Sequence, residues 1–282
     1  MLAQTVREAA RRFGSATAFV DPDGSRVGFD DLDRQSDAVA AALAEQGVRP
    51  GDRVVLRLPS TSRYVIAYAA AAKLGAVTAG ISPVLAPGEQ DRLEDLVDPG
   101  FVLRSPQEVD EYAGRGRSRP VPDPLPDDDN RPVAIVFTSG TTGRPKAALF
   151  TERQLRAAAI IDTGGAWADS PGTPTLASTQ FAHVGFMTKL PWYLRQGLRT
   201  HIQARWRAAD TLALVARERI PIVNAVAPQL ALMLKVPDFD SYDLSAVRMI
   251  VAGAAPAPPA LILEARRRFA APYCVRYSST ES

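Results

Sequence analysis

The sequence contains very little cysteine and histidine. Cys274 is the single cysteine among 282 residues, and His183 and His201 are the two histidines. One cysteine excludes a disulfide bond within the chain and suits a reducing compartment. We therefore expect Cys274 to be a small, buried, apolar residue on a strand.

Long hydrophobic runs are missing as well. The first 14 residues mix charged side chains with apolar ones and contain no continuous apolar segment, which argues against a signal peptide. The most apolar stretch, residues 64–81, is rich in alanine and is interrupted by Lys73, Gly75 and Gly80. A membrane-spanning helix needs about 20 strongly apolar residues. We therefore expect a soluble, cytoplasmic protein that does not bind membranes.

Neither sign of charge is in large excess. The chain has 33 Lys and Arg against 31 Asp and Glu, with 46% hydrophobic residues. This balance excludes a disordered chain and gives no reason to expect nucleic acid as a partner. The longest basic cluster, residues 115–119, contains glycine and serine and is typical of a loop. The length is sufficient for one large α/β unit or two smaller ones with a sizeable core.

Segments typical of strands and helices alternate along the chain. A helix is expected from an N-cap at Asp30 to Gly47, where the apolar spacing ends. The sequence further predicts strands at 54–56, 77–81, 133–138, 247–252 and 273–277, and helices at 63–74, 89–97, 151–161, 209–219 and 261–269. This alternation predicts an α/β fold of layered, mostly parallel β-sheets flanked by helices. Residues 113–131 are rich in proline, glycine and charge, and predict an exposed connector between two portions, 1–112 and 132–282.

The segment most informative about chemistry is residues 138–146, which directly follows a predicted strand. It reads Thr-Ser-Gly-Thr-Thr-Gly-Arg-Pro-Lys. Glycine lets backbone N–H groups approach an oxyanion, hydroxyl groups add donors, and lysine adds a mobile positive charge. A triphosphate needs all three. The Walker loop is excluded, because its lysine directly follows a glycine and precedes serine or threonine.

This segment resembles the phosphate-binding signature of the adenylate-forming (AMP-binding) superfamily, which includes acyl- and aryl-CoA ligases. Residues 29–54 and 73–77 resemble the opening elements of that family. Residues 252–256, Ala-Gly-Ala-Ala-Pro, resemble its adenine-binding turn, and residues 277–281, Tyr-Ser-Ser-Thr-Glu, resemble its Tyr-Gly-x-Thr-Glu motif. The resemblance covers nearly the whole chain. It implies that residues 1–282 are an incomplete large N-terminal domain of such an enzyme.

The resemblance also implies a role for each matched residue. Lys146, His183, Thr280 and Glu281 would take part in catalysis, Thr280 reaching the α-phosphate and Glu281 binding Mg²⁺. The ATP phosphates would be bound by Thr138, Ser139, Gly140, Thr141, Thr142, Gly143 and Lys146. The adenine would be bound by Gly253, Ala254, Ala255, Pro256 and Tyr277. The acyl pocket would be lined by His183, Phe186, Asn224, Pro228, Ala252 and Ser278.

His183 lies in the segment Phe-Ala-His-Val-Gly-Phe, which resembles the Phe-His-x-x-Gly motif of the family. In that motif the side chain borders the carboxylate of the acid. Relatives that activate amino acids usually carry an aspartate nearby to bind the substrate ammonium. Its absence here favours a plain carboxylic acid. His201 lies in no motif, and we expect a structural role for it.

The sequence departs from the family pattern in three places. Ser278 replaces the glycine of the tyrosine motif and is expected to narrow the acyl pocket or add a hydrogen bond. After Lys146 the family has Gly-Val and a later histidine, where this chain has two alanines and Glu152. The family continues beyond the position of Ser282 with a ribose-binding aspartate and a small C-terminal domain that supplies a lysine. We therefore expect the 282 residues alone to be inactive and prone to self-association.

The leading functional hypothesis is the N-terminal part of an ATP-dependent acyl- or aryl-acid:CoA ligase. Its substrates would be ATP with Mg²⁺, a small carboxylic acid and coenzyme A as the acceptor. A second hypothesis keeps the adenylation and transfers the acyl group to a carrier-protein thiol or an amine. A third is a non-catalytic nucleotide- or acyl-binding module.

Overall fold

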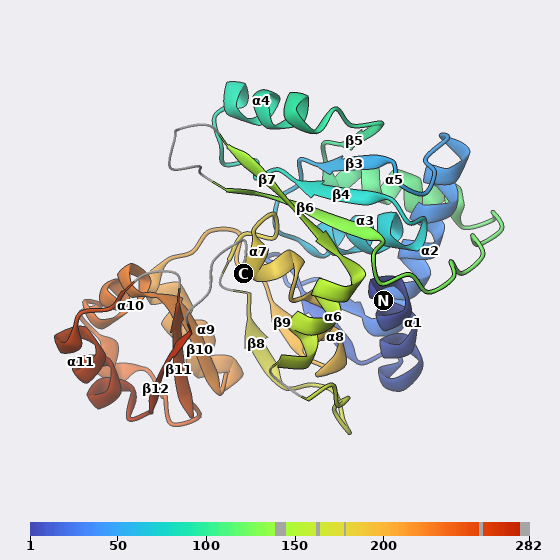
Figure 1. Cartoon of the computed structure of the whole chain (residues 1–282). Coiled ribbons are helices and arrows are strands. Elements are labelled where there is room, and N and C mark those ends of the chain that lie inside the picture. The colour runs from blue at the N-terminus through green and yellow to red at the C-terminus, as the bar shows by residue number, and fades with distance from the viewer. Residues whose placement is uncertain (139–144, 162–163, 178, 254–255, 277–282) are drawn as a thin grey trace.

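The computed structural model describes residues 1–138, 145–161, 164–177, 179–253 and 256–276. Within these residues the strands form three sheets flanked by helices (Figure 1). The sequence prediction of an α/β fold with layered sheets is therefore confirmed. None of the described helices is long and apolar enough to cross a membrane.

The first sheet has five strands in the order β5-β3-β4-β6-β7. Its β3 (Arg53–Leu56), β4 (Val77–Gly80), β5 (Phe101–Leu103) and β6 (Pro132–Thr138) are parallel, whereas β7 (Lys146–Thr151) is antiparallel to β6. One face packs against α4 (Pro87–Val97) through Val55 and Val77. The other face packs against α3 (Ser62–Lys73) through Val54 and Leu56. The parallel strands are therefore buried on both faces, as their apolar runs predict.

The second sheet has the order β2-β1-β9-β8 and joins distant parts of the chain. The strands β1 (Thr17–Val20) and β2 (Arg26–Gly28) form an antiparallel hairpin, and β1 pairs in parallel with β9 (Arg199–His201). The strand β8 (Pro174–Leu176) completes the sheet. Residues on both sides of the predicted connector thus contribute to the first and second sheets.

The third sheet is parallel, with the order β10-β11-β12. Its strands are β10 (Ile222–Val226), β11 (Met249–Gly253) and β12 (Tyr273–Arg276). They pack with α9 (Ala208–Glu218), α10 (Ala227–Leu234) and α11 (Pro259–Phe269) around a separate core. Figure 1 shows this group of elements to one side of the other two sheets.

Helix α3 is buried on nearly all sides, in the core shared by the first and second sheets. Tyr64 and Tyr68 are fully buried in it, and α1 (Leu2–Phe13) and α2 (Phe29–Glu45) pack against it. Its last residue, Lys73, is also buried, with Nζ 2.6 Å from Asp33 Oδ1 and 2.7 Å from Asp37 Oδ1. The ammonium group is thus paired on both sides, which offsets the cost of removing it from water.

Helix α5 (Pro106–Gly116) packs on α2 and extends into the segment predicted as a connector. The expectation of a loop at 115–119 is therefore wrong for Arg115 and Gly116. The helix continues because Val109, Ala113 and Gly116 form one buried face at helical spacing. Residues 117–131 have no helix or strand and are mostly exposed, as predicted. The remaining helices are α6 (Glu152–Ile161), α7 (Val184–Met187), α8 (Leu190–Arg195) and the 3₁₀ turn η1 (Phe239–Ser241).

Two further expectations are corrected. Gly28, not Asp30, is the N-cap of α2, because β2 leads directly into the helix and Phe29 is buried in its first turn. Cys274 lies on a strand as predicted but is exposed. The reason is that β12 is an edge strand of the third sheet, and most of its residues have no cover among the described elements.

Candidate functional site

The predicted phosphate loop connects two antiparallel strands. Thr138, the last residue of β6, pairs in register with Lys146, the first residue of β7. Thr138 is half-buried. Lys146 is exposed, and its amino group forms no ion pair with any carboxylate in the described part of the chain. The hairpin therefore brings both ends of the loop, including its lysine, to one point. Ser139, Gly140, Thr141, Thr142 and Gly143 lie outside the described residues.

The segment before α7 packs against the same end of this sheet. Gly80 is the last residue of β4, and a Cβ atom placed on it would lie 2.8 Å from the Cα atom of Ala182. Because β4 and β6 are parallel neighbours, Gly80 and Thr138 both lie at the carboxyl end of the sheet. Helix α7 also contacts β6. His183, adjacent to Ala182, is therefore held at the sheet end from which the hairpin loop leaves.

His183 is the N-cap of α7. Its Nδ1 atom accepts a hydrogen bond from the backbone N–H of Gly185 at 3.1 Å. An accepting Nδ1 carries no proton, so the neutral ring has its proton on Nε2. Partial burial also lowers the pKa of His183 below its ordinary value of 6.5. Both features favour a neutral imidazole with one N–H donor.

Two aromatic residues that flank His183 in the sequence are stacked on each other. Phe186 lies parallel to Phe181, with ring centroids 3.6 Å apart, and the rings of Tyr64 and Phe181 form a T-shaped pair with centroids 5.8 Å apart. The Oη atom of Tyr68 donates a hydrogen bond to the carbonyl of Met187 at 3.2 Å. Phe186 is fully buried in this stack. Its contact with an acyl group stays a prediction.

The carboxyl ends of the third sheet are also aligned. Val226, Gly253 and Arg276 lie side by side in register on β10, β11 and β12. A Cβ atom on Gly253 would lie 2.8 Å from the carbonyl oxygen of Arg276, so only glycine allows the strands to approach this closely. Pro256 is exposed beyond β11. The other residues predicted to bind adenine or metal, namely Ala254, Ala255, Tyr277, Thr280 and Glu281, lie outside the described part of the chain, as does Ser278.

The structure does not bring all the predicted acyl-pocket residues together. Asn224 pairs with Val251, whereas Ala252 pairs with Ala225. Successive residues of a strand point to opposite faces, so Asn224 and Ala252 lie on opposite faces of the third sheet. Ala252 is 3% exposed. Pro228 is exposed in the first turn of α10.

Sequence reasoning did not identify Gly80, whose lack of a side chain sets the position of the His183 segment. The available signal was a glycine at the end of a continuous buried strand, which often marks close approach of another backbone. The sequence also contained no sign that Tyr64 lies near the site, because an aromatic residue in an apolar helix is usually part of the core. Its hydroxyl has no hydrogen-bond partner among the described residues.

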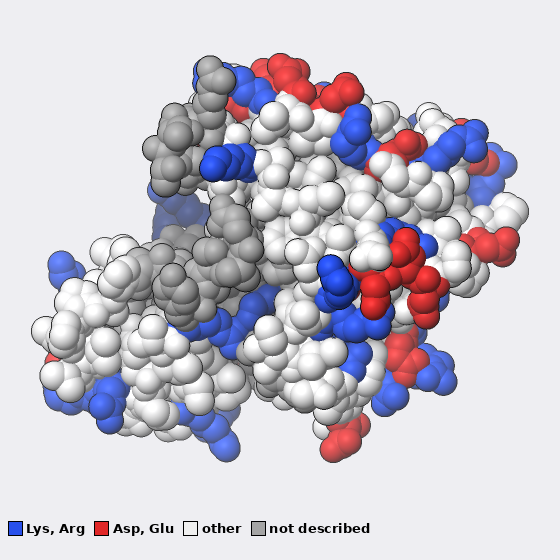
Figure 2. Space-filling view, in the orientation of Figure 1, with Lys and Arg blue, Asp and Glu red and all other residues white. Residues whose placement is uncertain are grey.

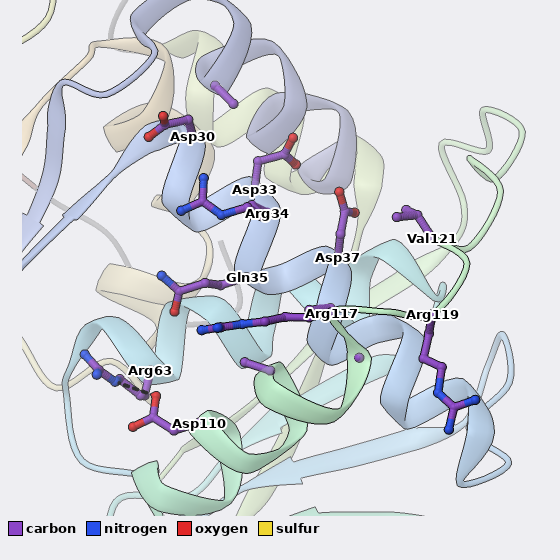
Figure 3. A pocket seen from close by; sticks show the side chains of 14 residues that line it. Asp30, Asp33, Arg34, Gln35, Asp37, Arg63, Asp110, Arg117, Arg119 and Val121 are labelled. Atoms are coloured by element: carbon purple, nitrogen blue, oxygen red, sulfur yellow. Dashed lines mark hydrogen bonds and ion pairs between the residues drawn. The ribbon is translucent and has the colours of Figure 1, made fainter.

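No group of three His, Cys, Asp or Glu side chains positioned to hold a metal ion occurs among the residues described in the structure. A hollow of about 880 Å³ lies elsewhere, between α2, α5 and the connector (Figure 3). Acidic and basic side chains alternate around it, including Asp33, Arg34, Asp110 and Arg117. None of the predicted site residues lines this hollow.

Both the sequence and the fold of the chain are similar to those of known proteins. The model of a family described as AMP-binding enzyme matches residues 6–282. The chain is 28% identical over 265 residues to 4-coumarate–CoA ligase 5 of Oryza sativa, covering 83% of this chain and 48% of that protein. It is also 28% identical over 275 residues to the long-chain-fatty-acid–CoA ligase FadD13 of Mycobacterium tuberculosis, covering 87% of this chain and 53% of the relative. The chain thus spans about half the length of the curated relatives it matches.

Solved structures share the fold. The N-terminal domain of FACL13 from Mycobacterium tuberculosis superposes with a TM-score of 0.86 at 25% identity, covering 99% of this chain and 76% of that chain. The anthranilate CoA ligase AuaEII, solved with anthranoyl-AMP, superposes with a TM-score of 0.88 at 19% identity, covering 99% of this chain and 59% of that chain. The second likeness concerns the fold alone.

Proposed function

Because the chain belongs to the AMP-binding enzyme family, we propose that it forms the nucleotide- and acid-binding part of an ATP-dependent acyl- or aryl-acid:CoA ligase. The complete reaction would join a carboxylate to ATP, giving acyl-AMP and pyrophosphate, and then pass the acyl group to the thiol of coenzyme A. The observation that best supports this proposal is the shared sheet end. Thr138 and Lys146, which pair with each other, and His183, the N-cap of α7, all lie at the carboxyl end of the first sheet.

In this proposal Lys146 neutralises negative charge on the β- and γ-phosphates. Its amino group forms no ion pair with a described carboxylate and is exposed, so it is available to an incoming anion. Residues 138–143 would add hydroxyl and backbone N–H donors. Phosphoryl chemistry of this type depends on positioning and on charge neutralisation more than on covalent catalysis.

We assign to His183 the orientation of the substrate carboxylate. A neutral imidazole with its proton on Nε2 donates one hydrogen bond to a carboxylate oxygen without cancelling its charge. The carboxylate therefore keeps its nucleophilic character while its position is fixed. Phe181 and Phe186, which flank His183 in the sequence, pack with Tyr64 in the buried core and so anchor the segment that carries the histidine.

The remaining assignments follow the family motifs. Gly253, Ala254, Ala255, Pro256 and Tyr277 would bind adenine, Thr280 would contact the α-phosphate and Glu281 would bind Mg²⁺. The metal, when bound with ATP, would supply charge neutralisation at the phosphates. The proposed acyl wall contains Ser278 with Asn224 and Pro228. We further propose that residues 1–282 belong to a single N-terminal adenylation domain.

The experiment that tests this proposal is ATP–pyrophosphate exchange with a panel of aliphatic and aromatic carboxylic acids, run on the longest natural form of the protein. Exchange that requires one class of acid supports the assignment. Nucleotide binding with no exchange for any acid would instead support a non-catalytic binding module. Adding coenzyme A, a carrier-protein thiol or an amine in separate reactions then identifies the acceptor.

A further inference from the structure

A second hollow, of about 520 Å³, lies where the β1–β2 hairpin meets the start of α9. The hairpin contributes Arg26, the segment after β9 contributes Arg205 and Arg207, and the buried His201 also lines the hollow. None of these residues belongs to the proposed ATP or acyl site. The hollow is therefore independent of the proposed function.

Three of the four arginines that line this hollow have no carboxylate partner among the described residues; the fourth, Arg217, pairs with Glu218. Arg26, Arg205 and Arg207 are exposed and form no ion pair with any carboxylate in the described ranges. Three positive charges from two separate segments thus face one cavity without their own counter-ions. Arginine guanidinium groups bind phosphate oxygens by paired, charge-assisted hydrogen bonds.

Two of the carboxylates that line the same hollow already have partners of their own. Asp21 is buried and accepts hydrogen bonds from the backbone N–H of Ser62 at 2.8 Å and from its hydroxyl at 2.5 Å. Glu218 lies 3.0 Å from Arg217 and 3.5 Å from Arg199. Asp210 is the only carboxylate lining the hollow that has no such partner among the described residues. The uncompensated charge of the cavity is therefore positive.

The start of α9 also borders the hollow, with Asp210 in the first turn of the helix. Arg207 is the N-cap of this 11-residue helix, and its side chain forms no capping hydrogen bond. The first N–H groups of the helix therefore have no side-chain acceptor at the cap. An oxyanion in the hollow would supply the missing acceptor.

His201 lies in the wall of the hollow, so its ring is sensitive to a ligand bound there. It is 5% exposed, and its Nε2 atom accepts a hydrogen bond from Nε of Arg199 at 3.4 Å. The Nε2 atom also lies 3.5 Å from Oε2 of Glu218. A new anion among the arginines would change the electrostatic environment of this ring directly.

We propose that this hollow binds the phosphate group of a small phosphomonoester. The volume exceeds that of a phosphate group, so it can also accept part of the molecule that carries it. The site joins the second sheet to α9, the first helix of the group around the third sheet. A bound phosphate would therefore connect these two parts of the molecule.

The test uses the two histidines of the chain as paired reporters, in protein without a histidine tag. Inorganic phosphate is titrated at fixed pH and ionic strength while the ring signals of His201 and His183 are followed by NMR. We expect a saturable shift of the His201 signals. The R205A/R207A double variant should lose at least about tenfold in affinity, because two charge-assisted contacts are removed. The R92A variant, which removes an exposed arginine from α4, should bind as the unmodified chain does.

Ribose 5-phosphate and glycerol 3-phosphate then distinguish a sugar phosphate from a lipid-type headgroup as the natural source. Tighter binding of either ester than of inorganic phosphate extends the assignment to that class. Circular dichroism of each variant checks that the fold is kept. The R26A variant provides a second test, at the wall formed by the β1–β2 hairpin. An unmoved His201 signal, or equal shifts in the unmodified chain and the double variant, would overturn the proposal.

Discussion

At the scale of single residues, His183 combines a structural and a proposed functional role on its two ring nitrogens. Nδ1 caps α7 by accepting the Gly185 N–H, which leaves the Nε2 proton for a substrate. Substitutions at this position should therefore separate the two roles. Asparagine retains a capping oxygen but does not place an N–H donor where Nε2 lies.

We therefore predict different outcomes for two variants at this position. H183A should lower the free energy of unfolding by about 0.5–1 kcal/mol, because the cap is lost. H183N should keep most of that stability and still impair acid-dependent pyrophosphate exchange. Chemical denaturation and exchange assays on both proteins test this. Equal exchange activity in H183N and the unmodified protein would remove His183 from the site.

The protonation of His183 gives a separate prediction. Burial depresses its folded-state pKa below 6.5, so the unfolded chain binds the proton more readily. The contribution of this group to stability is therefore fully present above pH 6.5 and is lost as the pH falls through the folded-state pKa. NMR titration of the ring should give a midpoint below that of a histidine in a denatured chain. A midpoint at or above that reference would contradict the assignment.

Prediction from sequence was uneven at this scale. The position of Lys146 followed from a run of glycine and hydroxyl residues with defined chemistry. The burial expected for Cys274 was wrong, because exposure depends on whether another element covers β12. The opposed faces of Asn224 and Ala252 required the sheet register, which a resemblance of motifs does not supply.

At the scale of elements, glycine determines how closely two helices approach. A Cβ atom on Gly116 of α5 would lie 1.8 Å from the carbonyl oxygen of Ala38 on α2. A side chain there requires the helices to separate. Gly114 lies on the same helix, and a Cβ atom on it would meet nothing within 4 Å.

These two glycines form a matched pair. G116A should lower the free energy of unfolding by about 1–3 kcal/mol, because the helix contact is overpacked. G114A should raise it by about 0.5–1 kcal/mol, because alanine loses less backbone entropy on helix formation. Urea denaturation of both variants measures the difference. Equal stability of the two variants would contradict the close packing of α2 and α5.

The helices and buried parallel strands could be predicted because their apolar periodicity is local. The expected helices at 63–74 and 209–219 match α3 and α9 closely. The strand β7 was not predicted, because its apolar and polar residues do not alternate. None of its six residues is buried. Its antiparallel pairing with β6 is nevertheless what brings the two ends of the predicted phosphate-binding motif, Thr138 and Lys146, together.

At the scale of the whole molecule, the sheets combine segments that are far apart in the sequence. The parallel pairing of β1 with β9 joins Phe19 to Thr200. Such long-range pairing could not be derived from local patterns, although the α/β class could. Figure 2 shows that acidic side chains gather over α4, while basic ones predominate over the group that contains α11. The nearly balanced total charge therefore conceals an uneven distribution on this face.

The central claim is that the end of the first sheet, with the β6–β7 hairpin, forms an ATP-binding site. The most direct measurement is the affinity of the 282-residue chain for ATP, determined by calorimetry for the unmodified chain, K146A and K235A. Lys235 is an exposed lysine at the end of α10 and serves as the matched control. A charge-assisted contact to phosphate contributes about 1.5–3 kcal/mol, so we predict that K146A binds ATP about 10- to 100-fold more weakly, whereas K235A binds normally. Equal affinity of K146A and K235A for ATP, or no binding by the unmodified chain, would contradict the account.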